Sequence, residues 1–498
     1  MTAGRGARAH DVIVVGGGPA GSTLAWRLAR DGVRVLLLER TRFPREKVCG
    51  DYVEPRGLRI LQRMGCLRRI EERAPLPITH SATFVGWEQR YADRIPFYGL
   101  DETLPPHGYI VPRDELDEAM LEAAERAGAT VHEETLVTAV DTGSNGVAVE
   151  ARRGGKRIRY RGRLIAGADG ANSVVGTSAG VLVDDPRHTA VAQRAYATGV
   201  DGELGEAAFF FDEELFPGYG WMFPLAGGRV NIGVGILSET RRRLDLNVPA
   251  LFVDFVERLK RFHPRCARLE LCSPPIGGIV RTYGGAGPNH FDGGVLVGDA
   301  GSFVDPMTGE GIAPAAESAL LAAPVLEAAL DADRSDAAQL RAYERAFRAY
   351  FDPAMTFLDF CAAVLRNRNL ARPWLKALAR GCDLAGGDED FARTGGSYFG
   401  GLDVRPFGIL AQLWARIASD LALAWPRLVL GLGRARDVRA TSVADLVEWQ
   451  LAWSRSLVAD PLWHARWSMD VQRKSIRLMS MLQRTAAPDP RAAGLVDG

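Results

Sequence analysis

The sequence predicts an α/β protein with a large antiparallel part: a Rossmann-like nucleotide-binding domain interleaved with a sheet-based substrate domain, followed by a helical C-terminal region. Three observations predict it. Short glycine- and aspartate-containing motifs at residues 16–21, 167–173 and 298–311 each follow an apolar run. Segments between 188 and 282 alternate apolar and polar residues, the period of a half-buried strand. Beyond residue 366 the apolar spacing is helical, and seven of the ten tryptophans lie there.

Size and composition limit the classes of protein to consider. A chain of 498 residues exceeds what one hydrophobic core supports, so two or three domains are expected. Its 61 Lys and Arg balance 61 Asp and Glu, which argues against a nucleic-acid-binding protein. The six cysteines form no CxxC pair and no metal-ligand spacing with histidine, so free thiols and no metal site are expected. With no secretory pattern and no apolar run of spanning length, we expect a cytoplasmic protein.

The first domain begins with a complete βαβ unit. Residues 11–15 are a continuous, β-branched apolar run, typical of a strand buried on both faces of a parallel sheet. A glycine turn at 16–21 follows, and residues 22–31 then have the apolar spacing of a helix. Residues 33–38 form the second buried strand. This order of elements is typical of dinucleotide-binding domains.

The glycines of this turn have distinct expected roles. Gly16 allows the tight turn, Gly18 lets the backbone approach a pyrophosphate, and Gly21 allows close packing of helix on strand. Glu39 ends the second strand, where its carboxylate can accept hydrogen bonds from ribose hydroxyls. That acid disfavours a 2′-phosphate, so the site is predicted to take FAD or NAD. The remaining predicted contacts of the turn are Pro19 and Ala20.

The third motif is stronger evidence for FAD than the second. Residues 295–297 form a buried strand, after which the carboxylate of Asp299 can reach a ribityl chain. Pro306 shapes a rigid turn, and Gly309 and Gly311 open an alanine-rich helix that begins at Ile312. The N-terminus of that helix would face the flavin edge where negative charge develops on reduction. Together with the Asp169–Gly170 turn of the second motif, the three motifs in this order indicate one bound FAD.

The rest of the chain follows the same patterns. The expected further elements are helices at 116–127, 249–262, 312–321 and 337–350, strands at 130–132, 207–211 and 229–236, and antiparallel strands within 135–165. The expected domains are an FAD-binding domain at 10–180 and 282–330, a substrate-binding sheet domain at 181–281, a helical region at 331–485, and a disordered tail at 486–498.

Over roughly residues 10–365 the chain resembles the geranylgeranyl reductase family, within the wider p-hydroxybenzoate-hydroxylase-like flavoproteins. The opening motif, Glu39-Arg40 and Arg113 match the wider group. Lys47-Val48-Cys49-Gly50-Asp51 resembles the reductases' Cys-Gly-Asp loop. The stretch 216–224, followed by 233–235, is similar to the family's YxWxFP…GxG signature.

The resemblance implies roles for these residues. Arg113 and the loop of Cys49, Gly50 and Asp51 would lie beside the flavin, and Arg40 and Val137 would contact the cofactor. Tyr219, Trp221 and Phe223 would line a lipid-binding pocket. Because side chains alternate along a strand, all three lie on one face, where they form either one shared pocket or one shared core. Gly176 stands where the wider group commonly has arginine, which weakens the case for NAD(P)H contact at the second motif.

The function implied is FAD-dependent reduction of isolated C=C bonds in a prenyl-like substrate, by hydride from reduced flavin N5. Cys49, Tyr219 and Trp221 are the candidate catalytic residues. The alternatives are a monooxygenase of bacterial secondary metabolism that works through a flavin C4a-hydroperoxide, a flavin-dependent halogenase, and a non-catalytic FAD-bearing membrane scaffold. The halogenase GWxWxIP differs from residues 218–224, and Lys47 lies in the Cys-Gly-Asp loop, which leaves no counterpart of the halogenases' catalytic lysine.

Two features concern partners. The glycine-rich residues 284–287 are followed by Pro288 and not by a helix, so no dedicated NAD(P)H domain is expected. The electron donor would be transiently bound NAD(P)H, a separate reductase or a ferredoxin. From 366 to 498 there are 19 Arg and Lys against 13 Asp and Glu. This region is either a helical subdomain on the substrate domain or a set of interfacial helices on an anionic membrane.

Overall fold

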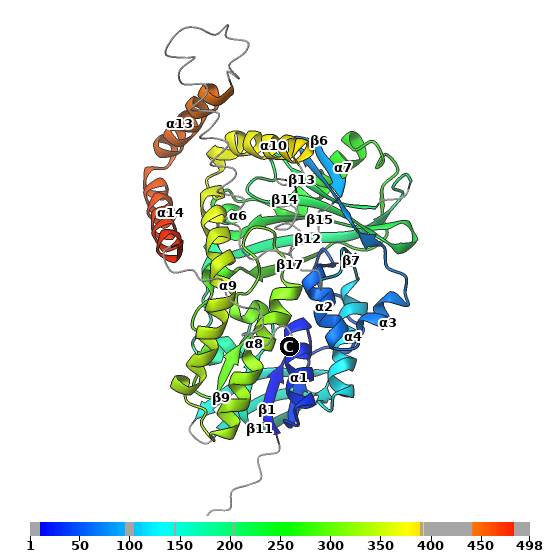
Figure 1. Ribbon diagram of the computed structural model, residues 1–498, viewed down its shortest axis with the longest axis vertical. Coiled ribbons are helices and arrows are strands. Elements are labelled where there is room, and N and C mark those ends of the chain that lie inside the picture. The colour runs from blue at the N-terminus through cyan, green and yellow to red at the C-terminus, as the bar shows by residue number, and fades with distance from the viewer. Residues whose placement is uncertain are drawn as a thin grey trace, which may run out of the picture.

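The computed structural model describes residues 10–94, 104–143, 146–202, 205–388, 392 and 441–482. Two sheet-based bodies lie one above the other in Figure 1, and the long helix α9 (Ala337–Leu365) runs alongside both. The lower body contains the N-terminal strand β1 (His10–Val15), and the upper body contains the strands β12 to β15. The predicted combination of α/β and antiparallel architecture is confirmed.

The lower sheet has the strand order β18-β19-β11-β1-β2-β8, with β9 and β10 attached beside β11. Strand β1 pairs in parallel with both β2 and β11. Its apolar run is buried on both faces: Val12 and Val14 belong to one core cluster, and Ile13 and Val15 to another. The other strands of this sheet are β2 Val35–Leu38, β8 Thr130–His132, β9 Thr135–Gly143, β10 Gly146–Arg153, β11 Lys156–Gly167, β18 His290–Phe291 and β19 Gly294–Leu296.

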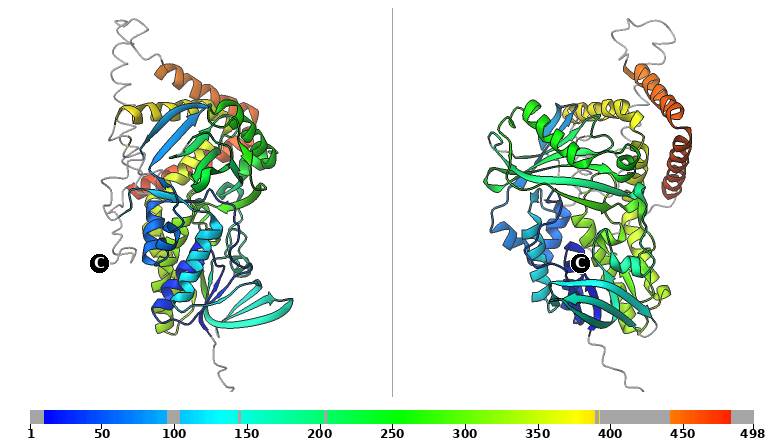
Figure 2. Two further views of the ribbon diagram at one scale, coloured as in Figure 1. Left: turned by 90° about the vertical axis from the view of Figure 1, so that its right-hand side faces the viewer. Right: turned by 180° about the vertical axis from the view of Figure 1, so that it is seen from behind.

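Helices cover one face of this sheet, while β9 and β10 extend from it as an antiparallel ribbon (Figure 2). Helix α8 (Ile312–Asp331) is the one helix of the described residues that is long and apolar enough to span a membrane, but 83% of its apolar window is buried inside the protein. It packs against α1 and α9 as a core helix. The other helices here are α1 Pro19–Arg30, α2 Pro55–Arg63, α3 Leu67–Glu71, α4 Arg113–Arg126 and α5 Val174–Ser178.

The upper sheet has the order β16-β12-β15-β14-β13-β5-β6, with β17 also pairing with β12. Helix α7 (Val248–Phe262) covers one face of it. The two strands β5 (His80–Val85) and β6 (Glu88–Arg94) belong to this sheet, because β5 pairs in parallel with β13. The predicted first span of the cofactor domain, 10–180, is therefore wrong in this stretch; the pairing joins segments about 125 residues apart, which local patterns do not reveal.

The remaining strands of the upper sheet are β12 Thr189–Thr198, β13 Glu206–Phe211, β14 Tyr219–Leu225, β15 Arg229–Leu237, β16 Glu270–Leu271 and β17 Ile276–Arg281, with the short helix α6 Ser238–Arg243 after β15. A small three-stranded sheet in the order β3-β7-β4 lies between the two bodies. Its strands are β3 Tyr52–Val53, β4 Pro77–Ile78 and β7 Gly108–Ile110. The loop that precedes β3 is therefore held between the two large sheets.

The C-terminal helices pack on the rest of the molecule. Helix α10 (Ala371–Gly387) lies against β5 and β6, and α14 (Pro461–Leu482) lies against α9 (Figure 2). Helix α13 (Thr441–Ala459) precedes α14. The indole Nε1 of Trp467 donates to the carbonyl oxygen of Ala363 at 2.8 Å. The tryptophans that pack together with it in this layer are Trp374, Trp449 and Trp463.

This packing agrees with a helical subdomain that lies on the substrate domain. Trp414, Trp425 and the predicted tail at 486–498 lie outside the described residues.

Candidate active site

The first glycine turn is shaped by the protein's own packing at two positions. Gly16 has φ +102°, and a Cβ there would lie 2.3 Å from the carbonyl oxygen of Ala168. A Cβ at Gly21 would lie 1.8 Å from the carbonyl oxygen of Gly16. At Gly18 the nearest atom to such a Cβ belongs to Arg45, 3.7 Å away. The space beside Gly18, at the N-terminus of α1, is therefore open to a ligand.

The predicted ribose acid is fixed beside this turn. Glu39 is 4% exposed, and its Oε2 accepts from the backbone N–H of Gly17 at 2.8 Å. Its Oε1 accepts from the backbone and hydroxyl of Thr41 at 2.9 and 2.7 Å. These bonds orient the carboxylate next to the open turn. Pro19 and Ala20 are buried in the first turn of α1, whereas Arg40 is exposed.

The three motifs converge in space. A Cβ at Gly298 would lie 2.9 Å from the Cβ of Ala20, so the third motif contacts the first. A Cβ at Gly21 would lie 3.2 Å from the side chain of Ala168, so the second motif contacts it too. Asp299 follows Gly298 in a 3-10 turn, and its Oδ2 lies 3.5 Å from the Nζ of Lys47.

The helix start of the third motif is built by two acids that are not among the predicted cofactor contacts. Asp305 accepts from the backbone N–H of Met307 and Thr308 at 2.7 and 3.1 Å, which closes the turn that contains Pro306. The Oε1 of Glu310 accepts from the backbone N–H of Ala313 at 3.0 Å and caps α8. Gly309 has φ +72°, a conformation that favours glycine. Gly311 is the N-cap residue of α8, and Ile312 is its first residue.

The second motif uses its carboxylate within the chain. Asp169 accepts from the hydroxyl of Ser173 at 2.6 Å and from the backbone N–H groups of Val174 and Val175 at 2.7 and 3.2 Å. It therefore caps α5, and its predicted contact with the cofactor remains a prediction. Val137 is buried in the core cluster beneath the sheet.

Arg113 and Cys49 lie together in the interior. Arg113 is 3% exposed and donates from Nε and Nη2 to both oxygens of Asp117, each at 2.8 Å. The arginine also interacts with the sulfur of Cys49. Burial raises the pKa of the Cys49 thiol above its usual value, with Arg113 opposing that rise, so a neutral thiol is expected. The ion pair between Arg113 and Asp117 joins two turns of α4 and is buried.

The predicted alternation of aromatics is confirmed. Tyr219, Trp221 and Phe223 of β14 share one cluster, whereas Met222 packs in the other core beneath α7. The ring centroids of Tyr219 and Trp221 are 6.1 Å apart, and those of Trp221 and Phe223 are 6.3 Å apart. A Cβ at Gly50 would lie 2.9 Å from the ring of Phe223, so the Cys-Gly-Asp loop rests on this aromatic layer.

The aromatic layer also contacts the third motif, because the hydroxyl of Tyr219 donates to the carbonyl oxygen of Thr308. Sequence reasoning missed the polar side chains beside this layer: Arg194 and Tyr196 on β12, and Asn231 on β15. Arg194 and Tyr196 lie two apart on one strand face, a spacing that the sequence contains but that carries no known motif.

A buried ionic cluster also escaped prediction. Arg56 donates from Nη2 to Glu54 at 2.8 Å and from Nη1 to Glu317 at 3.2 Å. The hydroxyl of Tyr350 donates to Glu317 at 3.0 Å. Burial raises the pKa of Glu54 to about 8, although Arg56 favours its ionised form. The cluster ties α2 to α8 and α9 behind the glycine-rich helix start.

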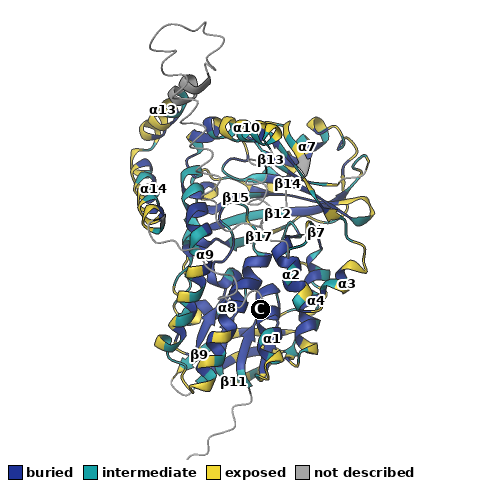
Figure 3. Cartoon of the chain, viewed as in Figure 1, coloured by how far each residue is buried: buried dark blue, intermediate teal, exposed yellow. Residues whose placement is uncertain are grey.

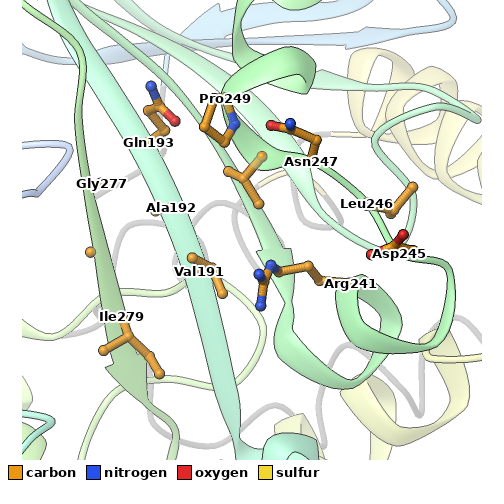
Figure 4. Close-up of a pocket in the computed structure, with 12 residues that line it drawn as sticks. Val191, Ala192, Gln193, Arg241, Asp245, Leu246, Asn247, Pro249, Gly277 and Ile279 are labelled. Atoms are coloured by element: carbon orange, nitrogen blue, oxygen red, sulfur yellow. The ribbon is translucent and has the colours of Figure 1, made fainter.

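A separate groove of about 860 Å³ lies on the upper body (Figure 4). It is lined by β12, β17, α6 and the segment that follows α6, including Val191, Ile279, Arg241 and Asn247. None of the predicted cofactor residues lines it. The cofactor assignment therefore depends on the converging motifs and not on this groove.

The residues present fit FAD. The open Gly18 backbone at a helix N-terminus suits a pyrophosphate, and the oriented carboxylate of Glu39 suits a ribose. Asp299 and the α8 N-terminus would hold the ribityl chain and the flavin edge. The glycine-rich residues 284–287 pack against His188 and Asp359 and open no second nucleotide site.

Comparison with known proteins agrees. Residues 9–198 match the family model described as an FAD binding domain. Menaquinone reductase of Mycolicibacterium smegmatis is 34% identical over 340 residues, which cover 66% of this chain and 78% of that protein. Digeranylgeranylglycerophospholipid reductase 2 of Methanopyrus kandleri is 30% identical over 385 residues, covering 75% of this chain and 90% of that protein.

Solved structures show the same fold. A geranylgeranyl bacteriochlorophyll reductase-like protein from Thermoplasma acidophilum superposes with a TM-score of 0.65 at 24% identity, covering 75% of this chain and 91% of that one. Structures of a halogenase and of a hydroxylase also share the fold. The fold alone therefore does not choose between reduction and oxygenation. By its motifs and its relatives, the chain belongs to the geranylgeranyl reductase family of FAD-dependent oxidoreductases.

Proposed function

We propose that this protein reduces isolated C=C bonds in the prenyl-like chain of an apolar substrate. The observation that carries the proposal is the aromatic layer of Tyr219, Trp221 and Phe223 against the Cys49–Gly50 loop. An isolated alkene has no carbonyl to take up charge, so its reduction favours a dry site whose aromatic faces tolerate developing positive charge. The names of the two reductase relatives support the same substrate class.

The roles of the residues follow from their positions. Bound FAD, once reduced, supplies hydride. Tyr219 and Trp221 would line the site of the alkene, with Trp221 held by its Nε1 bond to Asn231 at 2.9 Å. Cys49, a partly buried thiol beside Arg113, would lie next to the flavin as a neutral group.

Anaerobic turnover tests the proposal. The dithionite-reduced holoenzyme is mixed with geranylgeraniol or a short-chain menaquinone without oxygen, and products are analysed by mass spectrometry. A product heavier by two hydrogens per reduced bond supports the proposal. A product that forms only with oxygen and contains ¹⁸O from ¹⁸O₂ would instead identify a monooxygenase, and a chlorinated or brominated product a halogenase.

Strand β14 offers a matched pair of variants. Phe223→Leu changes the aromatic layer, whereas Met222→Leu alters a neighbouring side chain on the opposite face. We expect Phe223→Leu to lower kcat/KM about tenfold, a loss of about 1.4 kcal/mol of transition-state stabilisation. Met222→Leu should keep the wild-type value. Equal effects of the two changes would show that the layer acts only as a core.

We also propose that the electron donor is external, either transiently bound NAD(P)H or a reductase or ferredoxin. The support is that one glycine-turn βαβ unit holds the cofactor, while residues 284–287 are occupied by internal packing. Stopped-flow bleaching of the oxidised flavin by NADH, NADPH or reduced ferredoxin identifies the donor. Bleaching that saturates with NADPH at micromolar concentration would contradict a protein donor.

A peripheral membrane contact through α13 and α14 is a further proposal. Within the part of the chain that the structure describes, eight of the fourteen exposed large apolar side chains lie on these two helices. Val458 is 81% exposed and Leu462 75% exposed. Figure 3 shows exposed residues along both helices. The exposed Arg466 and Arg473 lie on α14 among Leu462, Met469 and Ile476, a combination that suits an anionic bilayer surface.

Flotation with vesicles tests this contact. The holoenzyme is mixed with phosphatidylglycerol or phosphatidylcholine vesicles at low salt. We expect binding to the anionic vesicles only, and its loss in Leu462→Glu. Val253→Glu, at an exposed apolar residue of α7, is the matched control and should still float. No flotation with either lipid would exclude the contact.

A further inference from the structure

The carboxyl group of Asp51 lies in the interior between the two sheets. Asp51 is fully buried and has φ +64°, a backbone conformation unusual for a residue other than glycine. Its carbonyl oxygen accepts from the backbone N–H of Val111 at 2.8 Å, which fixes the loop to the small middle sheet. Non-glycine residues held in such conformations cluster at functional sites.

Two neighbouring strands provide the partners of this carboxyl. Its Oδ2 accepts from the hydroxyl of Tyr196 at 2.7 Å and from Nδ2 of Asn231 at 2.8 Å. Tyr196 and Asn231 are directly opposite each other in the β12–β15 pair. The same Asn231 nitrogen lies 2.9 Å from the carbonyl oxygen of Cys49, and the Asn231 oxygen accepts from Trp221. The carboxyl is thus joined to both the Cys49 loop and the aromatic layer.

The second oxygen, Oδ1, has no hydrogen-bond partner among the residues that the structure describes. Burying a carboxylate with one oxygen that lacks a donor is costly, whereas a neutral carboxyl avoids the buried charge and carries on that oxygen an O–H that no described acceptor uses. The geometry therefore favours a neutral Asp51 with an available proton. No other side chain of the Cys49–Asp51 loop is fully buried, has one oxygen without a partner and has its second oxygen held by hydrogen bonds.

The charged groups around Asp51 partly offset this preference. Arg194 on β12 and Arg113 on α4 favour the carboxylate, as do the bonds from Tyr196 and Asn231. Burial has the largest effect and raises the pKa of Asp51 to about 7.

Two other titratable groups, Cys49 and Tyr196, lie beside this carboxyl. Burial raises the pKa values of the Cys49 thiol and the Tyr196 hydroxyl, so neither competes for the charge. Asp114 acts on Tyr196, and Lys47 acts on Cys49. Asp51 is therefore the group of this loop that can both hold and release a proton near neutral pH.

We propose that Asp51 is the acid that delivers the proton to the alkene carbon. The inference rests on the proposed function. The C=C π bond is replaced by two C–H bonds: one hydrogen comes with its electron pair as the hydride that FAD supplies, and the other comes as the proton of Asp51. The carboxylate left behind is held by Tyr196 and Asn231, and it regains a proton from solvent between turnovers.

Three variants separate this role from a structural one. Asp51→Asn keeps an oxygen that can accept from Tyr196 and Asn231 but removes the acid. Tyr196→Phe keeps the acid and removes one donor to the carboxylate. Asp212→Asn changes another buried aspartate of the upper sheet, which accepts from Trp87 and lies outside the candidate site.

Single turnover of the reduced holoenzyme with geranylgeraniol is the first measurement. We expect Asp51→Asn to slow product formation at least 100-fold and to abolish the pH dependence of the rate near neutrality, with FAD affinity retained. Tyr196→Phe should shift the pH dependence of the rate to higher pH, because the carboxylate of Asp51 loses a stabilising hydrogen bond and its pKa rises. Asp212→Asn should match the wild type. A wild-type rate and pH profile in Asp51→Asn would overturn the proposal.

Urea unfolding of the holoenzyme against pH is the second measurement and needs no substrate. A carboxyl whose pKa is raised on folding contributes stability at low pH that is lost as the pH rises through its folded pKa. Wild type should therefore lose stability relative to Asp51→Asn as the pH rises from about 4 to about 7, with no further difference above that range. Equal pH dependence in the two proteins would show that Asp51 carries no proton and would overturn the proposal.

The two measurements also distinguish the failures. A wild-type enzyme that reduces no prenyl probe overturns the proposed function, and with it the role of Asp51 in alkene reduction. If the wild-type enzyme reduces the prenyl probe and Asp51→Asn reduces it equally fast, only the assignment of the acid is overturned.

Discussion

Replacing Gly18 by alanine should weaken FAD binding while leaving the fold intact, whereas Gly21→Ala should destabilise the fold itself. At Gly18 the added methyl would meet only an Arg45 atom at 3.7 Å, and the backbone at φ −75°, ψ −172° is open to alanine. At Gly21 the methyl would lie 1.8 Å from the carbonyl oxygen of Gly16, so α1 would have to move away from β1.

The magnitudes follow from these distances. Gly18→Ala should change the free energy of unfolding of the cofactor-free protein by less than about 0.5 kcal/mol, as for other open positions. A methyl directed at the pyrophosphate should cost one charge-assisted hydrogen bond, about 1.5–3 kcal/mol, or roughly 10- to 100-fold in Kd. Gly21→Ala should destabilise the protein by about 1–3 kcal/mol or more through overpacking.

Two assays separate the effects. Urea unfolding of the cofactor-free proteins, followed by circular dichroism, measures stability, and quenching of flavin fluorescence measures FAD affinity. Gly381→Ala is the control, because the added methyl meets nothing within 4 Å and lies in α10, away from the site. If Gly18→Ala bound FAD like the wild type, or unfolded as readily as Gly21→Ala, the reasoning about the open turn would be refuted.

Three further predictions concern stability. Arg56→Met leaves the buried Glu317 without its cation and should lower the free energy of urea unfolding by about 3–5 kcal/mol; an unchanged midpoint would refute this. Burial lowers the pKa of His188 from 6.5 to about 4, so the unfolded chain binds the proton before the folded protein does. The free energy of unfolding of the wild type should therefore fall by up to about 3 kcal/mol as the pH falls from 6.5 to about 4. The decrease should be smaller in His188→Gln. Trp467→Phe removes the bond to the Ala363 carbonyl and should speed amide exchange in α14; unchanged exchange would contradict its docking role.

Local patterns were sufficient for the elements of the cofactor domain. The β-branched run before Gly16 predicted a strand with two buried faces, because only a parallel sheet covered on both sides suits such a run. The observed strand β8 coincides with the predicted 130–132, and α7 begins within one residue of the predicted 249. The alternation of Tyr219, Trp221 and Phe223 likewise placed them on one face without knowledge of the fold.

Contacts distant in sequence could not be predicted in this way. The parallel pairing of β5 with β13 moved residues 80–94 from the expected cofactor domain to the substrate sheet, because pairing depends on which strand edges meet. Asp169 was predicted to contact the cofactor, and in the structure its carboxylate accepts from the backbone of α5. The Asp-Gly sequence pattern is the same for a residue that caps a helix and for one that contacts a ligand.

By itself the sequence determined the FAD cofactor, the βαβ unit and the aromatic face of one strand, since each depends on residue spacing within a single element. Only the tertiary structure decided which polar groups surround the Cys49 loop. The Asp51 carboxyl meets Tyr196 and Asn231, some 145 and 180 residues further along, because β12 and β15 pair directly above that loop. Burial, which sets the proton affinity of such a carboxyl, is a property of the whole packed interior and not of any local segment.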